Sequence, residues 1–77
     1  MAKEGTMHNT GRVMFFDPQQ GYGFIEHIDG RQVYFHYTAI AREVINKHVS
    51  SGMKVYFDLL ETTSGWEAAN VVVFNGS

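Results

Sequence analysis

The chain has 77 residues, a formal net charge of −2 and no cysteine. This length predicts one small domain with a limited core, and the lack of cysteine excludes a disulfide framework and a thiolate metal site. The negative charge excludes a global positive field, so any binding to nucleic acid must depend on ring stacking and local charges. No apolar run has the length of a membrane span or forms the apolar part of a signal peptide, so we expect a cytoplasmic protein.

The N-terminal segment, residues 1–9, is polar and without period, and we expect a disordered tail before a domain at residues 10–74. A first strand is predicted over Gly11–Asp17. Its apolar residues are consecutive from Val13 to Phe16, so alternation does not assign them to the two faces. Strict alternation would place Phe15 beside Val13 in the core. The segment Asp17–Gly21 is predicted to turn, because its proline presets one turn dihedral.

The second and third strands are predicted over Gly21–His27 and Gln32–His36. Between them, Ile28–Arg31 contains the Asp-Gly pair that is typical of hairpin loops. After the third strand, Tyr37–Ala41 is predicted to form a short helical turn with Ile40 as its anchor in the core.

Aromatic side chains alternate along both of these strands. Because successive side chains in a strand point to opposite faces, Tyr22 and Phe24 share one face, as do Tyr34 and His36. If the two strands pair antiparallel, the four rings can form one patch of flat, partly polar rings. A patch of flat rings is a stacking platform for unpaired bases. The other interpretation is that Tyr22, Phe24 and Tyr34 belong to the core, where aromatic residues of small β domains are common.

The rest of the chain predicts two more strands. Residues 41–51 are expected to form a helical turn or an ordered loop. Met53–Glu61 alternates cleanly and predicts a fourth strand, and Glu67–Phe74 predicts a fifth with Ala69, Val71 and Val73 on one face. Residues 75–77 are expected to be frayed. Five short strands without an amphipathic helix predict an all-β fold, a small closed five-stranded antiparallel barrel of the OB-fold type. An RNA-recognition motif is set aside because its two packed helices are missing.

Several stretches resemble the cold-shock domain family. Gln20–Ile25, Gln-Gly-Tyr-Gly-Phe-Ile, resembles its first ribonucleoprotein motif, and Val33–Tyr37, Val-Tyr-Phe-His-Tyr, resembles its second. Further similarity lies at Gly11–Asp17, Thr38–Ile40 and Ala68–Val71, so the resemblance covers nearly the whole chain. It implies an OB-fold that binds single-stranded RNA or DNA with low sequence specificity. It also implies a nucleic-acid chaperone that influences transcription or translation, with no cofactor and no enzymatic activity.

The nucleic-acid-binding residues that we expect are six rings, two cations and one tryptophan: Phe15, Tyr22, Phe24, Tyr34, His36, Tyr37, Arg12, Lys54 and Trp66. The resemblance places Phe15 on the binding face, against strict alternation. Both assignments hold only if the first strand bends or bulges near Phe16. The cations of the chain are most simply solvating charges on the surface, and among them Arg12 and Lys54 are the expected phosphate contacts.

Trp66 stands where the family usually has proline, in the loop before the last strand. It either extends the platform as an exposed ring or covers the open end of the barrel. Two other departures remove charge, because Met14 and Gln20 occupy positions where the family has lysine. The segment Val44–His48 also lacks the aromatic residue that is usual there.

His36 could also serve as a metal ligand or a catalytic base. The four histidines of the chain show no ligand spacing, and no nucleophile or carboxylate is evidently placed beside His36, so we expect neither a metal site nor catalysis. A second hypothesis from a different class is a diverged or engineered OB barrel whose aromatic face mediates protein interaction or self-association. We expect a monomer with no membrane and no small-molecule substrate as partner.

Overall fold

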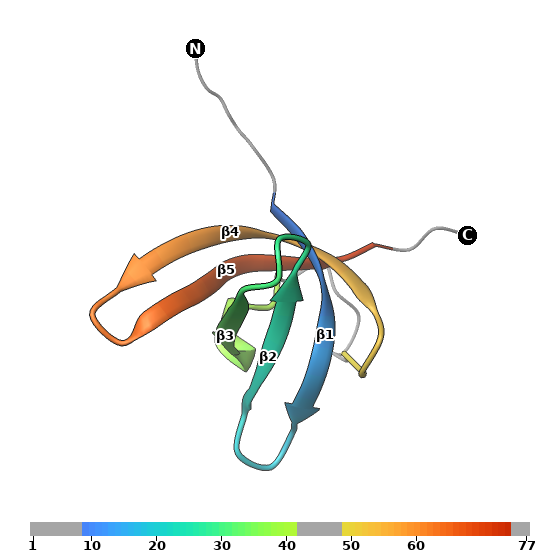
Figure 1. Ribbon diagram of the computed structural model, residues 1–77. Helices are drawn as coiled ribbons and strands as arrows, with labels where there is room; N and C mark the ends of the chain where they lie inside the picture. The colour runs from blue at the N-terminus through green and yellow to red at the C-terminus, as the bar shows by residue number, and fades with distance from the viewer. Residues whose placement is uncertain (1–8, 42–48, 75–77) are drawn as a thin grey trace.

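Five strands account for most of the residues that the structure describes. They are β1 (Asn9–Asp17), β2 (Tyr22–His27), β3 (Gln32–His36), β4 (Lys54–Thr62) and β5 (Gly65–Val73), with a 3-10 turn, η1 (Tyr37–Ala39), after β3 (Figure 1). The computed structural model describes residues 9–41 and 49–74. Within those ranges no helix is long and apolar enough to cross a membrane.

The strands close into a barrel in the order β1-β2-β3-β5-β4, with β4 pairing back onto β1. The pairs β1–β2, β2–β3, β4–β5 and β1–β4 are antiparallel, as predicted for the barrel. The exception is the pair of β3 and β5, which is parallel at Tyr34 and Glu67. Closure gives every strand two neighbours, which protects the backbone edges that an open sheet this small would expose. The predicted closed five-stranded barrel is confirmed, and so is the short helical turn after the third strand.

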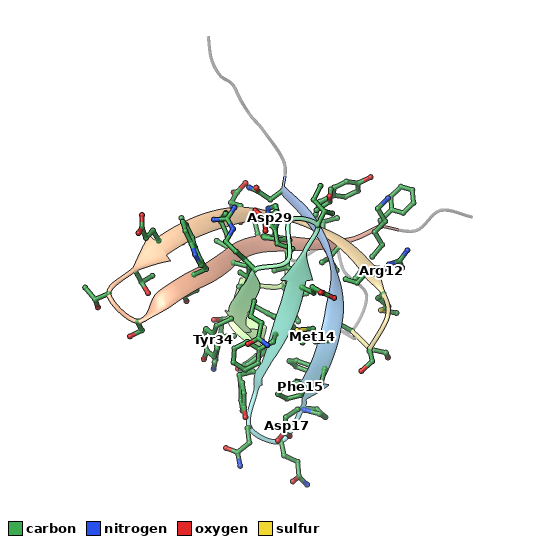
Figure 2. All side chains as sticks on the ribbon, viewed as in Figure 1. Arg12, Met14, Phe15, Asp17, Asp29 and Tyr34 are labelled. Carbon is green, nitrogen blue, oxygen red and sulfur yellow. The ribbon has the colours of Figure 1, made fainter. Side chains whose placement is uncertain are left out.

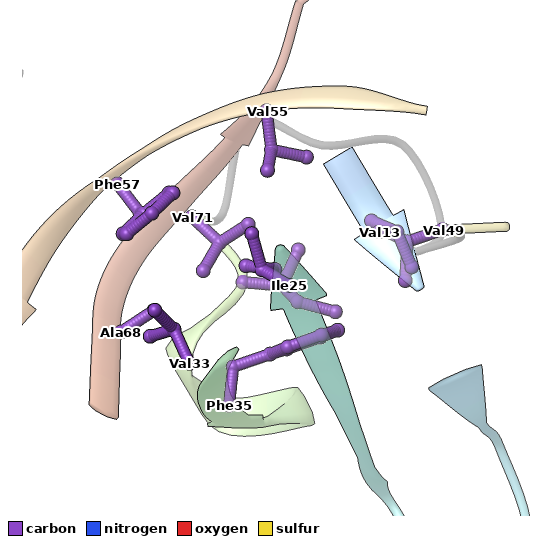
Figure 3. Close-up of a cluster of buried hydrophobic side chains, with 10 residues drawn as sticks. Val13, Ile25, Val33, Phe35, Val49, Val55, Phe57, Ala68 and Val71 are labelled. Atoms are coloured by element: carbon purple, nitrogen blue, oxygen red, sulfur yellow. The ribbon is translucent and has the colours of Figure 1, made fainter. Parts of the chain in front are cut away.

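The core lies inside the barrel and is built by alternation (Figure 3). Ile25 and Val33 face each other across β2 and β3, and both are fully buried. Ile40 follows η1 and is also buried, as predicted for the anchor of that turn. The buried apolar side chains are Val13, Ile25, Val33, Phe35, Ile40, Val49, Val55, Phe57, Ala68 and Val71.

A β-bulge at Met14 changes the phase of β1. Val13 pairs with Ile25, but Phe15 pairs with Phe24, so Met14 is an additional residue without its own partner on β2. Val13 is therefore buried, while Met14 and Phe15 are both exposed. The bulge predicted near Phe16 is present, and it lies just before that residue.

A second irregularity corrects the faces predicted for the last strand. Asn70 has a positive φ of 52° and lies where the β4–β5 register shifts. The sequence predicted Ala69, Val71 and Val73 on one face. Because of the additional residue, the buried side chains of β5 are instead Ala68 and Val71. The Asn70 amide donates to the Asp58 carboxylate at 2.8 Å, which supports this backbone conformation.

The turn before β2 follows from its residue types. The Asp17 side chain accepts hydrogen bonds from the backbone N–H groups of Gln19 and Gln20, as aspartate does in turns. Gly21 ends the turn with φ of 79°, and its N–H donates to the Asp17 carbonyl at 2.7 Å. This turn is followed directly by the first ring of β2.

Parts of three expected segments lie outside the described residues. They are residues 1–8 of the expected tail, residues 42–48 of the expected loop and the expected frayed end at residues 75–77. Asn9, the last residue of the expected tail, belongs to β1 and pairs with Phe57 on β4. Its side-chain oxygen accepts from Nε2 of His27, a buried histidine, at 3.0 Å.

Candidate nucleic-acid interface

The outer face of β1, β2 and β3 carries a group of aromatic side chains. The antiparallel register opposes Tyr22 to His36 and Phe24 to Tyr34, and the bulge adds Phe15 opposite Phe24. In Figure 2, Phe15 lies beside β1 and Tyr34 beside β3, with β2 between them. We call Phe15, Tyr22, Phe24 and Tyr34 the ring cluster.

Each ring of this cluster contacts at least two of the others. Phe15 lies 5.7 Å from both Tyr22 and Phe24, measured between ring centroids. Tyr34 lies 6.0 Å from Tyr22 and 5.9 Å from Phe24. Offset and edge-to-face pairs at such distances are favourable, so the rings hold one another in place while their outer parts stay accessible. Phe15 is 40% exposed.

Gly23 permits the close packing beneath the cluster. It is buried on β2 between Tyr22 and Phe24 and points inward. A Cβ added there would lie 2.4 Å from the Phe15 carbonyl oxygen and 2.9 Å from the Phe35 ring. Glycine is therefore required where β1 and the core ring of Phe35 both approach the backbone of β2.

His36 and Tyr37 extend the ring surface toward η1. Their ring centroids are 4.9 Å apart, and Tyr37 is 46% exposed. His36 Nδ1 accepts from the backbone N–H of Thr38 and lies 2.9 Å from its hydroxyl. A nitrogen that accepts from a backbone N–H carries no proton, so Nε2 holds the proton and is the donor available to a ligand. The imidazole thus caps η1 and keeps a fixed orientation.

Trp66 lies across a groove from the ring cluster. The groove has a volume of about 490 Å³ and lies between two rings of the cluster and the β4–β5 hairpin. Its lining residues are Phe24, Tyr34, Thr62, Thr63, Ser64, Gly65, Trp66 and Glu67. Trp66 is half-buried and packs against the core while it lines this groove. It thus combines features of the two roles that the sequence left open.

Arg31 holds the indole in position. Its guanidinium carbon lies 4.3 Å from the Trp66 ring centroid, within the range of a cation–π contact. The same guanidinium pairs with the Asp29 carboxylate at 2.7 Å. The hydrogen bond from Arg31 lowers the pKa of Asp29 from 3.8 to about 2. The sequence alone gave no signal for this contact, because it joins two different hairpins.

Arg12 and Lys54 lie together but apart from the ring cluster. They are partners across β1 and β4, and Arg12 also opposes Glu26 on β2. Arg12 donates to the Gly52 carbonyl at 3.1 Å, and the Lys54 ammonium lies 5.1 Å from the Phe74 ring centroid. Figure 2 shows Arg12 toward the opposite end of β1 from Phe15. These cations therefore flank the aromatic surface at one end, and a carboxylate lies beside them.

Sequence reasoning missed Glu67 and the hairpin residues Thr62–Gly65 as neighbours of the platform. Glu67 opposes Tyr34 in the parallel β3–β5 pair. Aromatic alternation does not reveal this contact, because it depends on the register between strands distant in sequence. Among the described residues, no three histidine, cysteine, aspartate or glutamate side chains are grouped so that they could hold a metal ion.

Comparison with known proteins gives a consistent family match. Residues 9–74 match the model of the 'Cold-shock' DNA-binding domain. The chain is 42% identical over 62 residues to cold shock-like protein CspC of Bacillus cereus, covering 80% of this chain and 94% of that protein. It is also 42% identical to cold shock protein CspB of Geobacillus stearothermophilus, covering 80% of this chain and 92% of that relative. Identity to cold shock protein CspC of Bacillus subtilis is 39% over 61 residues, covering 79% and 91%.

Proposed function

The chain belongs to the cold-shock domain family, a family of nucleic-acid-binding proteins, and on this basis we propose that its aromatic face binds single-stranded RNA or DNA. The observation that carries this proposal is the ring cluster, in which each of the four side chains contacts at least two others on one outer face. Aromatic faces accept any base, because every base has a π surface. The proposed binding therefore has low sequence specificity.

The proposed mechanism is trapping of the unpaired strand. A base stacked on Phe15, Phe24 or Tyr34 cannot pair at the same time, so binding shifts the equilibrium toward open nucleic acid. No cofactor and no catalytic step is required. Through this shift the protein would act as a nucleic-acid chaperone that affects transcription or translation, and we propose that it does so in the cytoplasm.

The cations have a secondary part in this proposal. Arg12 and Lys54 flank the ring surface and would contact phosphates where the strand leaves it. Each is already engaged by the protein, through Gly52 and Phe74, and Glu26 opposes Arg12. We therefore assign most of the affinity to stacking rather than to charge, with His36 and Tyr37 as additional contacts.

Titration with a short thymidine oligonucleotide tests the proposal. Phe24→Ala and Tyr34→Ala should each weaken binding by about 1–3 kcal/mol, the range for removing one stacking ring. Val33→Ala is the matched control, because Val33 lies next to Tyr34 but points into the core. It should lower the stability of the fold and leave the affinity of the folded protein unchanged. Absence of saturable binding by the parent protein would refute the proposal.

A second candidate function is self-association or protein binding. It is favoured by apolar side chains exposed elsewhere on the barrel, since Val72 and Phe74 are 39% and 43% exposed and Phe74 contacts Tyr56 edge to face. The proposed state is nevertheless a monomer. Sedimentation velocity over a range of concentrations distinguishes the two, because only self-association makes the sedimentation coefficient rise with concentration.

A further inference from the structure

We infer that Glu67 makes the groove beside Trp66 selective for guanine at one position of the bound strand. This inference rests on the proposed function and adds a specific base to a surface that otherwise accepts any base. It starts from the composition of the groove, which combines aromatic walls with one carboxylate.

The groove is continuous with the ring cluster. Phe24 and Tyr34 belong to both, and Trp66 supplies a third aromatic wall. The volume of about 490 Å³ is in the range of sites for small organic molecules. A strand lying on the cluster can therefore place one base in the groove without leaving the aromatic surface.

The carboxylate of Glu67 favours a base over a phosphate in this groove. Glu67 is half-buried and lines the groove next to its strand partner Tyr34. Its side chain makes no hydrogen bond or ion pair with another described residue. An ionised carboxylate repels a phosphate, and burying it without donors costs free energy. A ligand that enters the groove must therefore bring N–H donors.

Guanine meets this requirement best among the bases. Its Watson–Crick edge presents two adjacent donors, N1–H and N2–H, which match the two oxygens of one carboxylate. Cytosine and adenine present one amino group beside a ring nitrogen that accepts, and that nitrogen repels a carboxylate. Uracil and thymine present one N–H between two carbonyl oxygens. Recognition of unpaired bases on their Watson–Crick edges is common in single-strand binding.

Position scanning tests the inference. A thymidine heptamer is titrated against heptamers in which each position in turn is replaced by deoxyguanosine, with the Trp66 emission as readout. We expect one position where guanine tightens binding on the order of tenfold, the effect of one bidentate contact. Inosine at that position lacks the N2 amino group and should lose most of this gain.

Two variants assign the effect to the carboxylate. Glu67→Gln keeps the size of the side chain and should reduce the guanine preference to about twofold or less. The amide offers one acceptor oxygen, and its NH2 group is a donor that opposes the second N–H of guanine. Glu61→Gln is the matched control. It removes the same charge from the same hairpin, at the strand partner of Trp66, and Glu61 does not line the groove. Its guanine preference should equal that of the parent.

The possible results separate this inference from the proposed function. If all heptamers bind the parent equally, the guanine inference is wrong and single-strand binding stands. If Glu67→Gln tightens every heptamer by the same factor, the carboxylate only repels phosphate and the inference is again wrong. If no heptamer binds, the proposed function fails, and the inference fails with it.

Discussion

Phe15 provides the sharpest test of the binding face, because its position depends on the bulge at Met14. The side chain is 40% exposed. Full burial of a phenylalanine stabilises a fold by about 1.5–3 kcal/mol, so Phe15→Ala should lower the free energy of unfolding by about 1–2 kcal/mol in proportion to the covered part. In binding, loss of one stacking ring costs about 1–3 kcal/mol, which is roughly a 5-fold to 150-fold rise in Kd.

The matched control is Phe35→Leu. Phe35 is fully buried and lies on the inner face. Shortening this side chain should cost about 1–2 kcal/mol of stability, close to the cost of Phe15→Ala, but should leave Kd unchanged. Urea unfolding gives both stabilities, and fluorescence anisotropy of a labelled thymidine heptamer gives both Kd values. Equal Kd values for Phe15→Ala and the parent would refute the placement of Phe15 in the binding surface.

Three further predictions follow from the surroundings of the ring cluster. Met14→Lys combined with Gln20→Lys, both at exposed positions, should raise affinity and steepen the log–log salt dependence of binding by at most about 0.7 per added phosphate contact. The emission of Trp66 should be quenched by a single-stranded oligonucleotide, and Trp66→Ala should weaken binding by about 1–3 kcal/mol. If the oligonucleotide leaves the emission unchanged, Trp66 is not part of the site. The pKa of Asp29, about 2 because Arg31 donates to it, should return toward 3.8 in Arg31→Ala, as followed by the NMR shift of its carboxyl carbon. Because this pKa is lowered on folding, the contribution of the pair to stability is present above pH 4 and is lost as the pH falls through about 2.

The aromatic face was predictable from the sequence, because it depends on local alternation. Tyr22 and Phe24 alternate with Gly23 and Ile25, and this pattern assigns both faces of β2. The phase of β1 was not predictable from alternation, because Val13 to Phe16 are all apolar and only the family resemblance required a bulge. The structure places that bulge at Met14.

The groove was not predictable, for a different physical reason. It forms where β5 pairs with β3, so its shape depends on pairing between residues more than thirty positions apart in the chain, such as Tyr34 and Glu67. The contact of Arg31 with Trp66 likewise joins two hairpins. No local pattern contains such information. Trp66 could be identified as unusual from the sequence, but its neighbours could not.

The spacing within the ring cluster has a consequence for the conformation of a bound strand. Neighbouring ring centroids are 5.7 to 6.1 Å apart, whereas successive nucleotides of a duplex rise by about 3.4 Å. The distance between rings is larger than the rise between bases, so a strand in helical geometry cannot place successive bases on successive rings. A strand that uses several rings must be stretched and its bases separated from one another. Binding would then oppose base stacking within the strand as well as base pairing, and hairpins and stacked single-stranded helices would both be disfavoured.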